Sequence, residues 1–121
     1  MQKEFSFQYD IFNRIDDLDN EAKALLLQAR ENTKNAYAPY SRFKVSAVAL
    51  LDNDKTVAAT NQENASYPVG ICAERTLLSA VSSLQTDALI KTIAISYDNT
   101  NGESNKPISP CGICRQSLLE Y

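Results

Sequence analysis

Residues 44–60 read KVSAVALLDNDKTVAAT, two β-prone runs on either side of the polar cluster at 52–55. This pattern predicts a β-hairpin with strands at 44–51 and 56–60. Further along, 72–84 carries apolar residues at helical spacing and 90–97 reads as a buried strand, which predicts a helix followed by a third strand. A helical crossover usually makes the strands that it joins parallel, so we expect a mixed sheet.

Two more helices are predicted outside this region. Apolar residues at i, i+3, i+4 and i+7 between 19 and 36 predict an amphipathic helix, capped by Asp19 or Asn20, and Pro39 follows its end. Pro110 precedes a third helical stretch at 111–121. The chain is therefore expected to form one α/β domain, residues 1–121, with the element order α-β-β-α-β-α.

Length and composition limit the classes of function. The 121 residues, 44% of them hydrophobic and 22% charged, suit one globular core. Twelve Lys and Arg against fifteen Asp and Glu leave a net charge of −3, which argues against a nucleic acid partner. The longest apolar run, 47–51, is far short of the about 20 residues of a membrane-spanning helix. The first ten residues do not form a secretory signal, so we expect a cytoplasmic protein without a membrane partner.

The three cysteines form the strongest candidate site, since the chain contains no histidine. Cys111 and Cys114 have the Cys-x-x-Cys spacing that lets two thiolates face one metal, and Cys72 begins the preceding predicted helix. A structural zinc usually has four Cys or His ligands, so three sulfurs suit a catalytic zinc with one open position. Because helix N-termini favour anions, we expect a lowered pKa for all three thiols. A redox dithiol, with Cys72 as a buried core residue, is the alternative.

Glu74 favours the zinc interpretation. It lies two residues after Cys72, where a carboxylate in the first helical turn can stand beside a metal-activated water without ligating the metal. Zinc deaminases carry such a non-ligand glutamate, followed later in the chain by Pro-Cys-x-x-Cys. The same pattern occurs here as Cys72-Ala73-Glu74 and 110–114.

Three separated segments carry a family resemblance: AYAPYSRFKV at 36–45, NQENASYPVGICAERT at 61–76 and PCGICRQ at 110–116. They resemble the small, homotetrameric, three-cysteine zinc cytidine deaminases. The resemblance implies a three-layer α-β-α fold and a Zn²⁺ ion bound by Cys72, Cys111 and Cys114, with Glu74 transferring protons. It also implies hydrolytic deamination of cytidine and deoxycytidine to uridine and deoxyuridine, with release of ammonia, in pyrimidine salvage.

The resemblance also assigns residues around the metal. It places Arg75 against a zinc-ligating sulfur and implies that Ala65 and Tyr67 reach a neighbouring subunit's site. Substrate binding falls to Phe43 at the pyrimidine, Asn61 and Glu63 at a sugar hydroxyl, Gln116 near the metal-bound water, and Ala73. The negative charge of Glu63 would disfavour a substrate phosphate, which favours nucleosides over nucleotides.

The sequence departs from the family pattern at two places. Ser46 stands where glycine is common in the family. Family members also continue with two further strands and an aromatic-bearing tail, so we expect the domain to be C-terminally incomplete. The alternatives to a cytidine deaminase are a non-catalytic zinc or thiol-redox module and a blasticidin-type deaminase. The pair Asn61 and Glu63, together with Phe43, favours a pyrimidine nucleoside.

Overall fold

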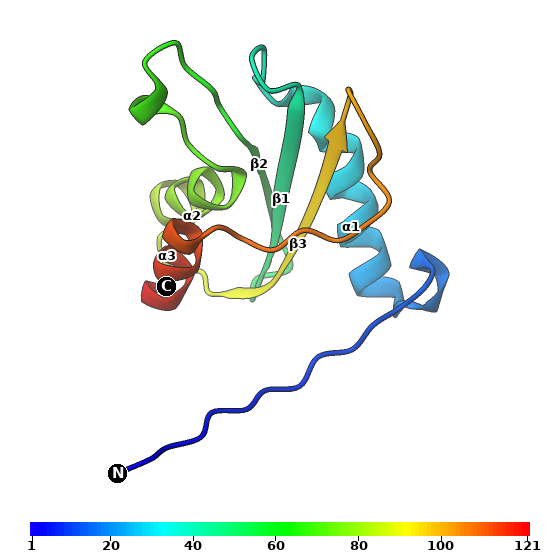
Figure 1. Ribbon diagram of the computed structural model, residues 1–121. Helices are drawn as coiled ribbons and strands as arrows, with labels where there is room; N and C mark the ends of the chain where they lie inside the picture. Colours follow the sequence, from blue (N-terminus) through cyan, green and yellow to red (C-terminus); the bar gives the residue numbers. More distant parts are fainter.

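A computed structural model describes all residues from Met1 to Tyr121 and has the predicted order of helices and strands (Figure 1). A short 3-10 turn at Ile15–Asp17 precedes these elements, and two more, at Thr33–Asn35 and Tyr67–Val69, lie between them. The helices and strands are α1 (Asn20–Asn32), β1 (Phe43–Leu51), β2 (Thr56–Thr60), α2 (Ala73–Leu84), β3 (Ile90–Asn99) and α3 (Gly112–Glu120).

The three strands form one sheet in the order β2-β1-β3. β1 is antiparallel to β2, with Ser46 opposite Thr60, and antiparallel to β3, with Val45 opposite Tyr97. β2 and β3 therefore run in the same direction, as the crossover predicts. The expectation of a mixed sheet is nevertheless wrong for these strands, because β1 lies between β2 and β3 and no parallel pair forms. The crossover through α2 passes over β1 and places β3 at the far edge of β1.

The central strand separates two apolar layers. Its side chains alternate between the two faces of the sheet, as expected for a strand with a period of two residues. Val48 and Leu50 pack with Leu25 and Ala29 of α1. The opposite face packs against α2, in a cluster of Val45, Ala47, Ala49, Leu51, Ala59, Ala73, Leu77 and Val81. Figure 1 shows α1 on one side of the sheet and α2 and α3 on the other, which is the three-layer α-β-α arrangement.

Capping and burial explain where the helices begin and which faces they present. The Asp19 carboxylate accepts a hydrogen bond from the Ala22 N–H at 2.7 Å, which satisfies one of the unpaired donors at the start of α1. Leu25 and Ala29, two of the apolar residues at helical spacing between 19 and 36, are buried, as an amphipathic helix requires. Leu84, the last residue of α2, departs from the apolar face predicted for 72–84, because it is 72% exposed and lies outside the buried cluster that α2 forms with the sheet.

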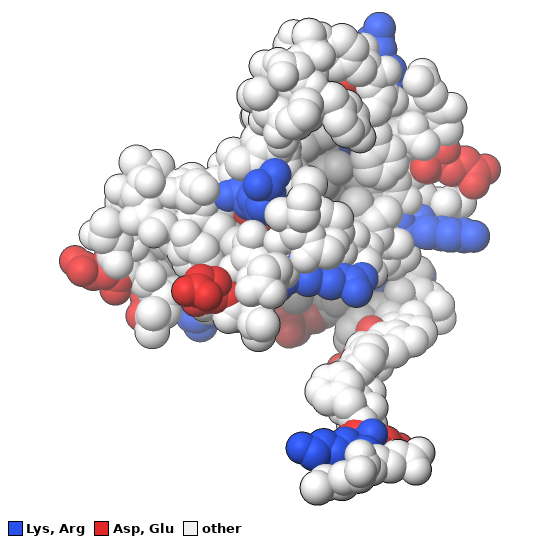
Figure 2. Space-filling model, turned by 60° about the vertical axis from the view of Figure 1, so that its left-hand side comes forward, with Lys and Arg blue, Asp and Glu red and all other residues white.

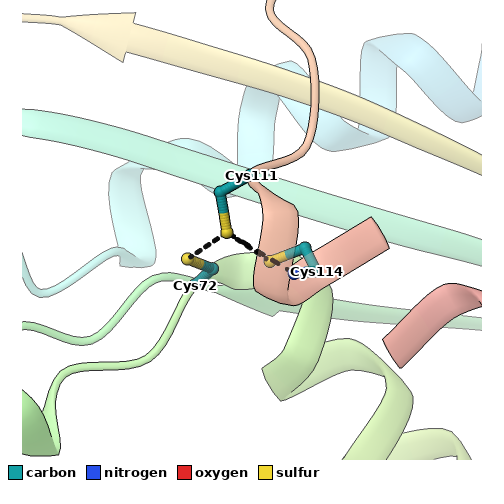
Figure 3. Close-up of side chains that lie close together, drawn as sticks. All are labelled: Cys72, Cys111 and Cys114. Atoms are coloured by element: carbon teal, nitrogen blue, oxygen red, sulfur yellow. Dashed lines mark hydrogen bonds between the residues drawn. The ribbon is translucent and has the colours of Figure 1, made fainter. Parts of the chain in front are cut away.

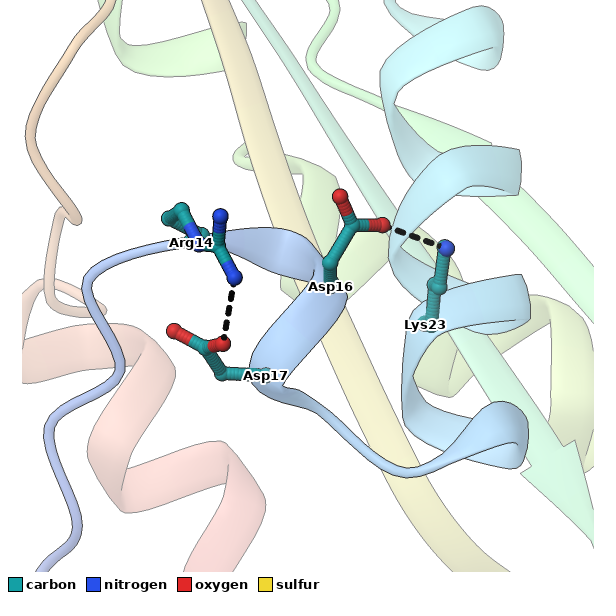
Figure 4. Close-up of polar contacts among 4 residues, drawn as sticks. All are labelled: Arg14, Asp16, Asp17 and Lys23. Atoms are coloured by element: carbon teal, nitrogen blue, oxygen red, sulfur yellow. Dashed lines mark hydrogen bonds and ion pairs between the residues drawn. The ribbon is translucent and has the colours of Figure 1, made fainter.

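The N-terminal segment, residues 1–13, extends away from the body of the protein and makes no hydrogen bond with it (Figure 1). The first polar contacts are the ion pairs Arg14–Asp17 and Lys23–Asp16, at 3.3 and 2.5 Å (Figure 4). Both pairs are exposed to solvent, where such pairs contribute little to stability.

Charged side chains of both signs are interspersed over the face shown in Figure 2. None of the helices combines the length and hydrophobicity that crossing a bilayer requires.

Candidate metal centre and active site

The three cysteines come together where α2 and α3 begin. Cys72 is the N-cap residue of α2, Cys111 is the N-cap residue of α3, and Cys114 lies in the first turn of α3. The Cys111 sulfur lies 3.8 Å from that of Cys72 and 3.4 Å from that of Cys114, and all three lie within 4.8 Å of one another (Figure 3). Two helix starts that are 39 residues apart in the chain thus form one cluster of thiols.

Backbone contacts hold both helix starts. The Cys72 carbonyl accepts hydrogen bonds from the N–H and the hydroxyl of Thr76, at 3.1 and 3.0 Å. At α3, the Arg115 side chain donates from Nε to the Pro110 carbonyl at 2.9 Å, and the Cys114 N–H donates to the Cys111 sulfur at 3.4 Å. Cys114 is fully buried and Cys111 is exposed, so the cluster opens to solvent on the Cys111 side.

The three thiols differ in acidity. Burial raises the pKa of Cys72 and that of Cys114 above the ordinary value for a thiol. The Cys114 N–H that donates to the Cys111 sulfur lowers the pKa of Cys111. The expectation that the helix N-termini lower the pKa of all three is therefore wrong for Cys72 and Cys114, because desolvation outweighs the effect of the helix end. A bound cation would supply the missing stabilisation of the thiolates.

The donor set fits Zn²⁺. Ligands at the usual Zn–S distance in a tetrahedral site have sulfurs about 3.8 Å apart, close to the separations in this cluster. With no histidine in the chain and three sulfurs in the cluster, the protein supplies three ligands and leaves one position for a small molecule. This is the coordination expected of a catalytic zinc.

A carboxylate lies beside the thiols. Glu74, in the first turn of α2, is only 5% exposed, and the one hydrogen bond of its carboxylate is a long contact of 3.7 Å from the Cys114 sulfur to Oε2. Ala73, the first residue of α2, is fully buried next to it. The next residue, Arg75, has a buried Nε–H without any hydrogen-bond acceptor. Such an unpaired buried donor is costly, and a thiolate sulfur of the cluster is a suitable acceptor for it.

A family comparison identifies this arrangement. Residues 19–121 match the family model described as the cytidine and deoxycytidylate deaminase zinc-binding region. The chain belongs to this family. Among curated deaminases, it is 42% identical over 98 residues to a cytidine deaminase of Mycoplasma genitalium, covering 80% of this chain and 70% of that one. It is 38% identical over 101 residues to one of Halalkalibacterium halodurans, covering 83% and 71%.

Solved deaminase structures have the same fold. The crystal structure of cytidine deaminase from Mycobacterium tuberculosis is similar to this chain with a TM-score of 0.70 and 36% sequence identity, over 86% of this chain and 78% of that one. The cytidine deaminase from Burkholderia pseudomallei is similar with a TM-score of 0.66 and 39% identity, over 79% and 72%.

In this deaminase the segment after β2 is tied to the start of β1. The Asn61 amide accepts from the Val45 N–H at 2.8 Å and donates to the Phe43 carbonyl at 2.9 Å. Glu63 Oε1 accepts from the N–H groups of Tyr40 and Ser41, both at 3.1 Å. Partial burial acts to raise the pKa of Glu63, but these hydrogen bonds outweigh it and hold that pKa below its usual value. Both side chains therefore hold the backbone of residues 40–45, the segment that leads into β1.

The remaining predicted residues are less constrained. The side chain of Gln116 is exposed on α3 and makes no hydrogen bond. Ala65 and Tyr67 are exposed in the segment before α2, Tyr67 by 91%. The partly buried Phe43 stacks on Tyr97 of β3, with ring centroids 5.0 Å apart and planes inclined by 17°. The sequence motifs did not assign Tyr97 to the site. Alternation with Ile93 and Ile95 could have placed it on the α2 face of the sheet, but only the pairing of β1 with β3 places it beside Phe43.

Proposed function

We propose that this protein is a hydrolytic, zinc-dependent cytidine deaminase. It converts cytidine and deoxycytidine to uridine and deoxyuridine and releases ammonia. The observation that carries the proposal is a buried carboxylate, Glu74, in contact with a cluster of three thiols that fits an open zinc site.

Cys72, Cys111 and Cys114 hold the metal in this proposal. A bound Zn²⁺ lowers the pKa of a water molecule to about 7 and so supplies hydroxide at neutral pH. Three thiolate ligands leave the site with a net negative charge, which weakens the metal as a Lewis acid. Arg75 would offset this effect: its buried Nε–H has no hydrogen-bond partner within the protein, and a hydrogen bond from it to a ligating thiolate would withdraw charge from that sulfur.

Glu74 moves the protons. It takes a proton from the attacking water and delivers it to the ring nitrogen adjacent to the amino-bearing carbon. It then transfers the second proton of the water to the amino group, which leaves as ammonia. The burial of Glu74 suits this role, because a carboxylate that is shielded from bulk water exchanges its proton with the substrate.

The nucleoside lies between the metal and the Asn61 segment. Phe43 packs against the pyrimidine, and Ala73 and Gln116 line the site near the base. The Glu63 oxygen that binds the backbone is Oε1, so Oε2 can accept from a sugar hydroxyl. The negative charge of Glu63 disfavours a phosphate at this position, so the substrates are nucleosides and not nucleotides.

The proposal includes a cellular setting. A nucleoside deaminase of this kind serves pyrimidine salvage in the cytoplasm, and we propose a homotetramer in which Ala65 and Tyr67 contact a neighbouring subunit's site. Exposure of both residues leaves them available for such a contact. The net charge of −3 argues against nucleic acid or an anionic membrane as a partner.

The deciding experiment follows the ultraviolet absorbance of cytidine and deoxycytidine during incubation with purified protein of known zinc content. We expect both nucleosides to be converted and cytidine monophosphate to be a much poorer substrate. Failure of a protein with one zinc per chain to convert either nucleoside would refute the proposal. That result would favour a non-catalytic zinc module, and turnover of blasticidin alone would favour the other deaminase class.

A further inference from the structure

Tyr97 contacts Phe43 of the proposed site and the loop that leads to Cys111. Its ring stacks on Phe43, and its hydroxyl group donates to the Lys106 carbonyl at 2.5 Å and accepts from the Lys106 N–H at 3.3 Å. One side chain thus holds the aromatic residue at the start of β1 and both backbone groups of a residue in the loop between β3 and α3.

The contact with Lys106 is important because the rest of that loop is weakly held. Residues 100–111 form no helix or strand. Apart from a local hydrogen bond from Asn105 to Glu103, the two with the Tyr97 hydroxyl are the only hydrogen bonds that residues 105–109 make. Ile108 adds an apolar contact with the cluster beneath α2, which Phe43 and Tyr97 also contact. Only four residues separate Lys106 from Cys111, so this attachment lies close to the start of α3.

The other side of the stack is also held. Arg42 precedes Phe43 and has a φ of 59°, in the left-handed region that an arginine adopts only when its surroundings hold it there. The Arg42 carbonyl accepts from both the N–H and the hydroxyl of Thr100, at 3.2 and 3.1 Å. Phe43 therefore enters β1 from a backbone that is attached to the end of β3.

We propose that Tyr97 is a positioning residue that links the base-binding aromatic residue to the segment carrying two zinc ligands. Its ring sets the orientation of Phe43, and its hydroxyl sets the path of residues 106–110 into Cys111. The part of this inference that concerns Phe43 rests on the proposed function, in which Phe43 contacts the base. The attachment of the loop does not depend on the substrate.

The two roles can be separated with two variants. Tyr97→Phe keeps the ring and removes the hydroxyl with both of its hydrogen bonds to Lys106. The Lys106 amide should then exchange with solvent at least about fivefold faster, which is the value of the lost N–H bond alone. Zinc transfer to a chromogenic chelator should accelerate by a similar factor, and the KM for cytidine should change less than twofold. Tyr97→Leu removes the stack as well, and the KM should then rise severalfold. Tyr9→Phe, at an exposed tyrosine of the N-terminal segment, is the matched control.

Unchanged amide exchange and unchanged zinc transfer in Tyr97→Phe would overturn the attachment of the loop. A KM in Tyr97→Leu equal to that of Tyr97→Phe would overturn the role of the stack. If Tyr97→Leu does not fold, Tyr97→Ile replaces it, and a KM equal to that of Tyr97→Phe would again overturn the role of the stack. Absence of cytidine turnover in the unaltered protein refutes the proposed function instead, while exchange and zinc transfer still test the loop attachment.

Discussion

The metal end and the sugar end of the proposed site are built in opposite ways. At the metal end, polar side chains lack strong partners: three thiols contact one another, Glu74 has one long hydrogen bond, and the Arg75 Nε–H has none. At the sugar end, Asn61 and Glu63 already bind four backbone groups between Tyr40 and Val45.

This difference indicates how each end depends on its ligand. The metal end brings together groups that are costly to bury, and a bound cation satisfies them. The sugar end is organised by the protein itself, so its residues hold the backbone in addition to any contact with a nucleoside. Changes at the metal end should therefore affect zinc binding and chemistry, and changes at the sugar end should affect KM and stability together.

The largest effect is expected from Cys114→Ser, which removes the buried sulfur. Two thiols remain, and zinc content should fall from one per chain to nearly none, with turnover below detection. Elemental analysis and the ultraviolet assay measure both. Ser82→Ala, at an exposed position of α2, is the control and should retain its zinc. Full zinc occupancy in Cys114→Ser would show that the cluster is not the metal site.

Glu74→Gln should separate chemistry from metal binding. The amide cannot carry the proton, so kcat should fall by about 10²- to 10⁴-fold, the usual range for loss of a general acid-base group. Zinc content should stay at one per chain because Glu74 is not a ligand. Glu120→Gln, at an exposed position of α3, provides the comparison. A variant that retains normal turnover would exclude Glu74 from catalysis.

Asn61→Ala should show the double role of the sugar end. It removes two hydrogen bonds to β1, so the free energy of unfolding should fall by about 2 kcal/mol, and the KM for cytidine should rise. Denaturant unfolding of the zinc-loaded protein and steady-state kinetics measure the two effects. An increased KM without any loss of stability would mean that Asn61 acts on the substrate alone.

Glu63→Gln should have a smaller effect on stability, because an amide oxygen still accepts from the two N–H groups. The KM for cytidine should rise with the zinc content unchanged, since the change is made at the sugar and not at the metal. Kinetics with cytidine and a zinc assay test this expectation, and an unchanged KM would remove Glu63 from the binding site.

The smallest effect is expected in how the stability difference between the unaltered protein and Glu63→Gln depends on pH. The folded-state pKa of Glu63 lies below its unfolded value of about 4.3. Its charge therefore contributes stability above about pH 4.3, and this contribution disappears as the pH falls through the folded pKa. The unaltered protein should be more stable than Glu63→Gln by a constant amount near neutral pH, and this difference should shrink below about pH 4. An advantage that persists at lower pH would show that the charge of Glu63 is not responsible.

Much of the fold follows from local patterns. The helix starts at Asp19, Cys72 and Cys111 and the hairpin all depend on residues close together in the chain, and the structure has them as predicted. The grouping of the cysteines could also be predicted, because two short motifs at helix starts carry all three thiols and Glu74. These features depend on spacing, capping and periodicity, which act over a few residues.

Other features required the tertiary structure. Only strand pairing placed β1 between β2 and β3, which made every pair of neighbouring strands antiparallel and brought Tyr97 to Phe43. Only packing decided which thiols are buried, and hence why the pKa of Cys72 and of Cys114 rises. The backbone partners of Asn61 and Glu63 likewise lie about twenty residues away along the chain. Burial and long-range hydrogen bonds depend on which segments meet in space, and a local sequence pattern does not contain that information.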